Sequence, residues 1–400
     1  MLYQAFSIKG FRRVLSGKEF RMDKAVRNMN DLLPHLEAAA NEIADRSIGF
    51  DHLQEGERRG KPIYSAPDIK TAIVLKKVND NLKRVFSVKQ ADRTKLIQTI
   101  AVLLNEDTPY FIIKSDIRQF YESISRKRIF RKVQNNNLLS YESKWLLDKI
   151  FTSKPVTGAP GLPRGLAVSA TLSEVYLRYF DQAVRCLPGV YYYGRFVDDF
   201  IIFCIQEPDK TKQRISDLLQ RLSLTLNLDK TEIFHHTENN PSSPIQFDFL
   251  GYHFDKSPQK KQPTITIATK KLQKIKTRIV RSILSYTKDK NEDLLESRIR
   301  FLTSNYHLHT HSASTPLKAG IFFNYPLAKD CLDDLRLLDR FLRGQIFSRN
   351  NITSKKGVPL SAALKATLSK YSFYRGYTNR IEYNFPDIEI KKIRECWRYD

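Results

Sequence analysis

The chain has no long hydrophobic run. Within its 400 residues, no apolar stretch approaches the roughly 18 to 20 residues that a membrane-spanning helix requires. The opening residues, MLYQAFSIKGFRR, lack the order of a secretory signal, in which a basic stretch precedes an apolar one. These absences argue against a membrane or secreted protein and predict a cytoplasmic one.

Cysteine is scarce. The four cysteines, at positions 186, 204, 331 and 396, are scattered and show no Cys-x-x-Cys spacing. A disulfide framework or a cysteine zinc site would need closer and more regular spacing. The scattered thiols fit the reducing conditions of a cytosol.

Acidic residues are outnumbered by basic ones. Asp and Glu total 43 against 67 Lys and Arg, which gives a formal net charge of +24. Hydrophobic residues still make up 41% of the chain, enough to build cores. An excess of positive charge this large implies a polyanionic partner, most often a nucleic acid, with an acidic membrane surface as the second candidate.

The apolar pattern predicts a mixed α+β protein whose centre differs from its flanks. Residues 1–109 favour helices, as over 68–85, and a polar break, GERRGKP (56–62), interrupts them. Residues 257–400 favour basic helices, and SPQKKQPT (257–264) has the composition of a linker.

The centre, residues 110–256, alternates predicted strands and helices. Short β-branched and aromatic runs predict strands within 110–117, 191–205 and 247–254. Helical patterns lie between them, for example at 169–180 and 210–222.

Three carboxylates stand at the ends of predicted strands. Two apolar runs meet at Val197-Asp198-Asp199, which predicts a tight hairpin with adjacent acids at its tip. A second apolar run, FIIKS, ends in Asp116. A strand that terminates in a carboxylate places that charge at a sheet edge, where a cation can reach it.

Such a cluster suits a hard divalent cation. Mg²⁺ is usually held by a few carboxylates and by substrate phosphates. Two such ions, about 3.5–4 Å apart, can stabilise both the attacking and the leaving oxygen of a phosphoryl or nucleotidyl transfer. The alternative interpretation is an ordinary polar turn at 198–199 and a helix N-cap at Asp116.

Five segments resemble motifs of the reverse transcriptases, in the order in which that family carries them. They are SDIRQFYESI (115–124), GLPRGLAVSATLSEVYL (161–177), FVDD (196–199), LNLDKTEIF (226–234) and FLGYHF (249–254). They resemble the palm motif with its metal-binding Asp, the Gly-rich motif, the Tyr-x-Asp-Asp box, the following turn with its Lys, and the primer-grip hairpin. Upstream, ADRTKLIQ (91–98) resembles the fingers segment of bacterial reverse transcriptases.

The resemblance implies a right-hand polymerase, with fingers, a palm built on an antiparallel sheet and a helical thumb. We therefore expect a helical N-terminal region and fingers in 1–109, the palm with a fingers insertion in 110–256 and a basic helical thumb or C-terminal domain in 257–400. It further implies an RNA-directed DNA polymerase that uses Mg²⁺, an RNA template and deoxynucleoside triphosphates to make a DNA product.

The same resemblance assigns roles to the residues of the first and third motifs. Asp116 and Asp198 match the metal-binding acids, and Asp199 matches the second acid of the box. The backbone carbonyl of Ile117 stands where a metal is also contacted. Tyr121 matches the steric gate, whose ring excludes a ribose 2′-hydroxyl; the alternative is an ordinary core residue at a helix start.

Other roles are implied around these residues. Gly161 and Gly165 would let the backbone approach the nascent base pair, which glycine permits at little cost. Ser169 is expected to cap the following helix or to contact the template. Lys230 stands where the family often places a Lys that protonates the leaving pyrophosphate, and a surface Lys is an equal alternative. The candidates for gripping the triphosphate are Lys83, Arg84 and Arg93, unless they belong to a solvated helix.

Two positions depart from the family pattern. Phe196 opens the Asp-Asp box where many relatives have Tyr, so a ring remains but its hydroxyl is lost. Arg164 stands where many relatives have Gln, which adds a charge and five donors and puts substrate preference in question.

The C-terminal region offers two further nucleic-acid candidates. Residues 270–281 carry six Lys and Arg and no acid, with apolar residues at helical spacing, which predicts an amphipathic thumb helix that tracks phosphates or a merely solvated one. Residues 370–383 interleave aromatic and cationic side chains, which suits stacking on single-stranded bases or burial in a core.

The amino-acid sequences of the motifs are most similar to those of bacterial defence-associated reverse transcriptases, including the abortive-infection branch. The overall pattern resembles the smaller polymerase of a type-3 defence system. The 400 residues show no added integrase, RNase H or maturase segment, which disfavours retroviral and intron-type relatives. This branch implies antiviral DNA synthesis with a noncoding RNA, a second reverse transcriptase subunit or homo-oligomerisation, and no membrane partner. Retron-type enzymes are the nearest alternative.

Two other functions stay open on the sequence. One is a DNA polymerase that starts without a template or primer. The other is a catalytically silent palm that serves as an RNA-binding scaffold, although an intact acid triplet near phosphates argues against it.

Overall fold

The computed structural model describes residues 3–23, 25–58, 60–236, 244–257, 262–308, 317–348 and 350–397. The chain forms two compact units, one of residues 1–93 and 108–238 and the other of residues 94–107 and 239–400. Each unit combines helices with β-sheets, so the mixed α+β class predicted from the sequence is confirmed.

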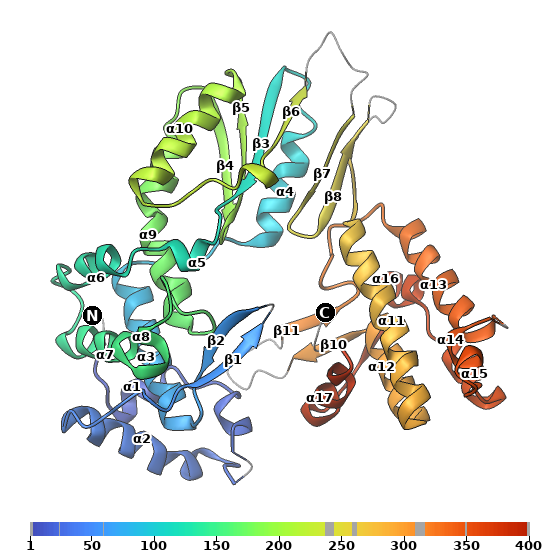
Figure 1. The fold of residues 1–400 in the computed structure, drawn as a ribbon, viewed down its shortest axis with the longest axis horizontal. Coiled ribbons are helices and arrows are strands. Elements are labelled where there is room, and N and C mark those ends of the chain that lie inside the picture. Colours follow the sequence, from blue (N-terminus) through green and yellow to red (C-terminus); the bar gives the residue numbers. More distant parts are fainter. Residues whose placement is uncertain are drawn as a thin grey trace. The chain divides into compact units, whose positions relative to one another are not determined.

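The first unit is built on a four-stranded antiparallel sheet in the order β4-β5-β3-β6 (Figure 1). Its strands are β3 (Tyr110–Asp116), β4 (Val190–Phe196), β5 (Asp199–Cys204) and β6 (Glu232–His236). The predicted strands at 110–117 and 191–205 are thereby confirmed, the second as a hairpin. Strand β5 is buried from Phe200 to Cys204, which explains its unbroken apolar sequence.

Helices cover this sheet and extend the core. Helix α9 packs against β4, and α10 packs against β3. One hydrophobic cluster runs from the sheet through α9 into α3 and α2. The helical elements of this unit are α1 (Ile8–Arg12), the 3₁₀ turn η1 (Glu19–Arg21), α2 (Met29–Ala44), α3 (Ile69–Val85), α5 (Phe120–Ser123), α6 (Arg126–Gln134), α7 (Tyr141–Thr152), α8 (Lys154–Thr157), α9 (Ala167–Arg185), α10 (Pro208–Arg221) and the 3₁₀ turn η2 (Leu228–Lys230).

Local sequence explains where these helices start. Asp68 accepts a hydrogen bond from the backbone N–H of Thr71 and so caps α3. Pro208 occupies the first position of α10, where its missing N–H costs nothing. The predicted helices at 68–85, 169–180 and 210–222 are confirmed in position.

The polar break at 56–62 is a β-hairpin rather than a loop. Strands β1 (Gln54–Arg58) and β2 (Lys61–Ser65) pair antiparallel, and Gly60 in the turn has a φ of +70°. Every residue of β1 is exposed, so the strand shows no apolar alternation that could have indicated it.

The second unit contains two three-stranded sheets, β7-β8-β9 and β11-β10-β12, packed with helices. The predicted strands at 247–254 form the hairpin β7–β8. Its elements are α4 (Arg93–Leu103), β7 (Ile245–Phe249), β8 (Tyr252–Lys256), β9 (Thr264–Ile267), α11 (Thr269–Asp289), α12 (Glu292–Thr303), β10 (Asn305–Leu308), β11 (Leu317–Gly320), α13 (Leu332–Phe347), α14 (Ile352–Lys355), α15 (Ala362–Leu368), α16 (Phe373–Thr378), β12 (Glu382–Tyr383) and α17 (Asp387–Glu395).

The C-terminal region is therefore less purely helical than its sequence indicates. In its described residues four short strands interrupt the helices, and each has only two to four residues, too few to show a period. Of the segment interpreted as a linker, residues 258–261 lie outside the described residues. Within the described ranges, no helix is both long and apolar enough to cross a membrane.

Candidate active site

The sheet of the first unit brings the three predicted carboxylates together. Asp116 is the last residue of β3 and Asp199 the first of β5, and the two lie directly opposite each other in the antiparallel register. Asp198 lies in the two-residue turn between β4 and β5. Directly opposite residues of such a pair project from the same face of a sheet, so the strand ends concentrate negative charge.

Backbone hydrogen bonds fix this end of the sheet. The N–H of Ile117 donates to the carbonyl of Asp198 at 3.2 Å, and the N–H of Asn227 donates to the carbonyl of Asp116 at 3.0 Å. Val197, just before the acids, has a φ of +61°, a left-handed conformation that a β-branched residue rarely adopts. The turn is thus strained and held in place by its neighbours.

The carboxylates repel one another in a partly dehydrated setting. Burial raises the pKa of Asp199 to about 6, and the charges of Asp198 and Asp116 add to this effect. Burial also raises the pKa of Asp198, with Asp116 acting in the same direction. Both shifts mean that a cation placed among the three acids would relieve an unfavourable charge.

Lys230 supplies one such positive charge. It closes the 3₁₀ turn η2, and its Nζ lies 2.5 Å from Oδ2 of Asp116. The hydrogen bond with Asp116 raises the pKa of Lys230, so the side chain is charged. The side chain is 67% exposed, and from this position it can leave Asp116 and reach solvent or a bound ligand.

The remaining oxygen of Asp116 fits a metal. Asp116 is 5% exposed, and its Oδ1 is buried without a hydrogen-bond partner among the described residues. The described residues hold no preformed group of three or more acidic, His or Cys ligands. Mg²⁺ does not need one, because it is commonly held by one or two carboxylates completed by water and substrate phosphates. The carboxylates of Asp116, Asp198 and Asp199 supply oxygens here, and a metal contact of the Ile117 carbonyl stays a prediction.

A second group of residues lies beside the acids and includes Tyr121. Burial raises the pKa of Tyr121, and the nearby Asp198 carboxylate acts in the same direction. The guanidinium of Arg164 lies over the Tyr121 ring, 5.2 Å from its centroid. Tyr121, the predicted steric gate, is therefore in contact with Arg164, the residue that departs from the family pattern.

Glu122 anchors Arg164 in that position. Arg164 donates to both carboxylate oxygens of Glu122, with Nε–Oε1 at 2.8 Å and Nη2–Oε2 at 3.1 Å. Lys61, from the hairpin strand β2, donates to the same carboxylate at 2.9 Å. Burial disfavours the ionised carboxylate, but the hydrogen bonds from Arg164 and Lys61 outweigh it and lower the pKa of Glu122 to about 2.

Glycine allows the Gly-rich motif to pack closely. At Gly165, with a φ of +92°, an added Cβ would lie 2.3 Å from the carbonyl oxygen of Tyr64. At Gly161, with a φ of +59°, it would lie 2.1 Å from the carbonyl oxygen of Tyr121. Both glycines therefore bring the loop against neighbouring protein backbone, which fixes Arg164 between them.

The expected N-cap role of Ser169 is wrong. Helix α9 starts at Ala167 after Leu166, and Ser169 is its third residue, 1% exposed and with no hydrogen-bond partner for Oγ in the described part of the chain. After the turn at Gly165 the helix is capped at Leu166, three residues earlier than expected, and Val168 then packs in the core.

The other predicted residues fall in different places. Phe196 ends β4 opposite Asp199 and is half-buried beside the acids. Lys83 and Arg84 lie in the last turn of α3, where Arg84 pairs with Asp80 at 2.9 Å. Arg93 begins α4. The grip of these three cations on a triphosphate stays a prediction.

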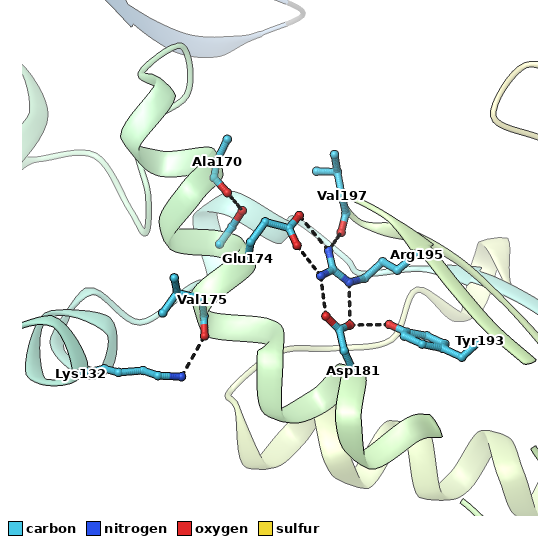
Figure 2. Close-up of polar contacts among 9 residues, drawn as sticks. Lys132, Ala170, Glu174, Val175, Asp181, Tyr193, Arg195 and Val197 are labelled. Atoms are coloured by element: carbon cyan, nitrogen blue, oxygen red, sulfur yellow. Dashed lines mark hydrogen bonds and ion pairs between the residues drawn. The ribbon is translucent and has the colours of Figure 1, made fainter. Parts of the chain in front are cut away.

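Sequence reasoning missed a buried cluster beside the turn that carries Asp198. Arg195, 9% exposed, lies between Glu174 and Asp181 of helix α9 and also donates to the carbonyl of Val197 (Figure 2). Tyr193 donates to Asp181 at 2.7 Å. The available signal was a single Arg inside the apolar strand YYYGRF, because a charge there must find partners when it is buried.

Lys61 and Glu122 were also missed. Lys61 belongs to the hairpin that was interpreted as a polar break, and Glu122 lies within the first motif without a role of its own. The glycine turn of GERRGKP was the one signal for the hairpin.

Comparison with known families agrees with this geometry. Residues 16–254, more than half of the chain, match the family described as Reverse transcriptase (RNA-dependent DNA polymerase). The comparison with curated proteins found no match. The matched range contains β3, β4 and β5 and with them all three carboxylates. The chain belongs to the reverse transcriptase family, whose activity is RNA-directed DNA polymerisation.

Proposed function

We propose that the chain copies RNA into DNA at the cluster formed by Asp116, Asp198 and Asp199. The observation that supports this most directly is the Asp116–Asp199 register pair with Asp198 at the adjoining turn. On this proposal the N-terminal region with the fingers, the palm and the thumb have the expected limits 1–109, 110–256 and 257–400. The first unit then holds most of the fingers and palm, and the second unit holds the thumb together with residues 94–107 and 239–256.

In this site each acidic group has a defined task. Asp116 and Asp198, with the Ile117 carbonyl, would hold Mg²⁺, and Asp199 would complete the negative cluster. The chemistry that Mg²⁺ supplies when bound is stabilisation of the attacking 3′-oxygen and the leaving pyrophosphate oxygen. The buried Oδ1 of Asp116, which has no hydrogen-bond partner in the described part of the chain, and the mutual repulsion of Asp198 and Asp199 favour this assignment.

The remaining residues would position the nucleotide and handle its proton. A primer 3′-hydroxyl attacks the α-phosphate, a new P–O bond forms, and pyrophosphate leaves. Lys230 would give its proton to that leaving group, because its charged Nζ already lies at the cluster. Tyr121 would exclude ribonucleotides, with Phe196 under the primer end and Gly165 and Arg164 beside the nascent pair.

The second unit contributes a basic helix that suits a thumb. Helix α11 carries Lys270, Lys271, Lys274, Lys276, Arg278 and Arg281, while Ile279 and Ile283 face its core. Phosphate contacts from such a helix would add affinity that falls with salt.

The test is primer extension on an RNA template with deoxynucleotides and Mg²⁺. We expect product from the wild type and a loss of about 10³-fold or more in Asp198→Asn, because a metal-binding charge is removed. Asp209→Asn, which removes an exposed carboxylate from α10, is the matched control and should keep full activity.

Other outcomes of this assay decide between the alternatives. Synthesis that needs no added template or primer would favour the template-independent polymerase. Tight RNA binding without synthesis would favour the silent scaffold. Activity retained in Asp198→Asn would remove the catalytic assignment.

We also propose a role in bacterial antiviral defence with a noncoding RNA, as for the smaller polymerase of a type-3 defence system, with a retron-type enzyme as the alternative. This proposal rests on the sequences of two motifs, DIRQFYESI and GLPRGLAVSATLSE. Purification from the native host, followed by sequencing of the bound nucleic acid, tests it. A structured RNA transcribed next to this gene would support it, and random cellular RNA would contradict it.

A further inference from the structure

Arg195 uses every one of its donors in the interior of the first unit. Its side chain is 6% exposed. The five contacts are Nε to Asp181 Oδ1 at 2.8 Å, Nη2 to Asp181 Oδ2 at 2.7 Å, Nη2 to Glu174 Oε2 at 2.7 Å, Nη1 to Glu174 Oε1 at 3.2 Å and Nη1 to the Val197 carbonyl at 2.7 Å. A guanidinium has five N–H groups, so this one is fully satisfied.

Four of these contacts attach Arg195 to one helix. Glu174 and Asp181 both project from α9, two turns apart, and each binds the guanidinium with both carboxylate oxygens (Figure 2). Tyr193 adds one hydrogen bond to Asp181, whose two oxygens the guanidinium already holds. Because a bidentate Arg–carboxylate pair fixes direction as well as distance, two of them leave the guanidinium little freedom.

The fifth contact reaches the turn that carries the acids. The carbonyl of Val197 begins the peptide group that leads into Asp198, and Arg195 holds it. The next peptide group is held by the residue that follows β3, since the N–H of Ile117 donates to the Asp198 carbonyl. With the peptide on each side fixed, both backbone torsions of Asp198 are set.

This turn needs such support. Val197 has a φ of +61°, in the region that β-branched residues avoid. Its side chain packs against the core of the first unit, so the conformation is not set by an exposed loop. Strained backbone of this kind persists only when its surroundings over-determine it.

We propose that Arg195 is a positioning residue for nucleotidyl transfer, which holds the Val197–Asp198 peptide and so aims the Asp198 carboxylate at the metal. The inference rests on the proposed function of Asp198. It assigns the two carboxylates of α9 the task of fixing Arg195, and it links the helix that follows the Gly-rich motif to the metal-binding turn.

The competing interpretation is an ion-pair cluster that only joins α9 to β4. Both interpretations predict a loss of stability when Arg195 is changed, since buried carboxylates would lose their partner. The two interpretations differ in what they predict for the turn at Val197-Asp198. Only a positioning role predicts that metal affinity and kcat change independently of stability.

The decisive variant is Arg195→Lys. Lys keeps the charge between Glu174 and Asp181 but has three donors on one atom and cannot serve both carboxylates and the Val197 carbonyl together. The control is Tyr193→Phe, which removes one hydrogen bond to Asp181 and leaves the Arg195–Val197 contact in place.

Three measurements are made on wild type, Arg195→Lys and Tyr193→Phe, well below each melting temperature. They are the melting temperature, kcat and KM for a deoxynucleotide in primer extension, and Mn²⁺ affinity by electron paramagnetic resonance without nucleotide. For Arg195→Lys we expect kcat to fall about 30-fold or more with KM changed less than about threefold, and Mn²⁺ to bind at least about fivefold more weakly. Tyr193→Phe should match the wild type in kcat and Mn²⁺ affinity whatever its melting temperature.

The result that overturns the inference is an Arg195→Lys protein that melts earlier yet keeps wild-type kcat and Mn²⁺ affinity. If Arg195→Lys does not fold, Asp181→Asn replaces it, since this variant keeps the Glu174 pair while weakening the second anchor. Asp181→Asn should lower kcat and Mn²⁺ affinity by about threefold or more, and wild-type values for both would overturn the inference. A wild type that makes no DNA but binds Mn²⁺ more tightly than Arg195→Lys would contradict the proposed function and leave the positioning role supported.

Discussion

Lys230 and Asp116 form an ion pair at the carboxylate cluster, with Nζ 2.5 Å from Oδ2. The two side chains differ in exposure: that of Lys230 is 67% exposed and that of Asp116 only 7%. The carboxylate is therefore enclosed by protein, while the lysine side chain is open to solvent. This asymmetry suits a group that neutralises the acids before substrate binds and then follows the developing charge of the leaving pyrophosphate.

Lys230→Met removes that charge at nearly constant length. We expect kcat in primer extension to fall about 100-fold, within the range of a lost general acid. Lys230→Arg keeps the charge but gives up its proton far less readily, so it should preserve the KM for deoxynucleotides while kcat still falls. Lys210→Met, at a lysine of α10 whose side chain is 78% exposed, is the control. If Lys230→Arg retained wild-type kcat, Lys230 would act through charge alone.

Tyr121→Ala should admit ribonucleotides. Arg164 lies over the ring and Glu122 fixes Arg164, so the ring has little freedom to turn away from a 2′-hydroxyl. A steric clash of this size is worth about 1–3 kcal/mol, or about 5- to 150-fold in discrimination. Competition between a deoxynucleotide and the matching ribonucleotide measures it. Tyr121→Phe keeps the ring and should keep the discrimination, and an unchanged ratio in Tyr121→Ala would remove the gate role.

The carboxylate cluster was predictable because its signals are local. An apolar strand that ends in Asp116 and a hairpin that turns at Asp198-Asp199 can each be recognised within a few residues. The antiparallel register then brings Asp116 opposite Asp199 without further information.

The supporting contacts were not predictable, because their partners are distant in sequence. Arg195 meets Glu174 and Asp181 only once α9 packs against β4. Arg164 and Glu122 are separated by 42 positions and meet only when the Gly-rich loop folds back on the first motif. Ser169 was misassigned because a backbone turn at Gly165, rather than a capping side chain, starts α9.

Glu122→Gln should destabilise the protein in a pH-dependent manner. The pKa of Glu122 falls from 4.5 to about 2 in the folded state, so its ionised form favours folding. This contribution, about 2 kcal/mol for hydrogen bonds to a charged group, is fully present above about pH 5 and is lost as the pH falls from 4.5 towards 2. Urea unfolding of both proteins between pH 7 and 3.5 measures it.

The expected result for Glu122 is a stability gap that is constant at neutral pH and narrows below pH 4.5. Glu207→Gln serves as the control, since its carboxylate pairs with Lys210 on the surface and is 60% exposed. A gap for Glu122→Gln that stayed the same down to pH 3.5 would show that lost packing, and not lost charge, causes the destabilisation.

Gly165→Ala should disrupt the loop that carries Arg164. Two effects act together, since the φ of +92° disfavours any side chain and the new Cβ would lie 2.3 Å from the Tyr64 carbonyl oxygen. Gly60→Ala separates them, because Gly60 also has a positive φ, +70°, but an added Cβ meets nothing within 4 Å.

Gly158→Ala completes the comparison, with a φ of −77° and open space around the added Cβ. We expect Gly158→Ala to be neutral, Gly60→Ala to cost about 1 kcal/mol of unfolding free energy from backbone strain, and Gly165→Ala to cost at least about 3 kcal/mol. Only Gly165→Ala should also lower kcat, because the backbone at 164–165 pairs with β2 and carries the guanidinium that lies over Tyr121. Equal losses in Gly60→Ala and Gly165→Ala would mean that torsional strain alone explains the need for glycine at position 165 and that close approach to Tyr64 adds nothing.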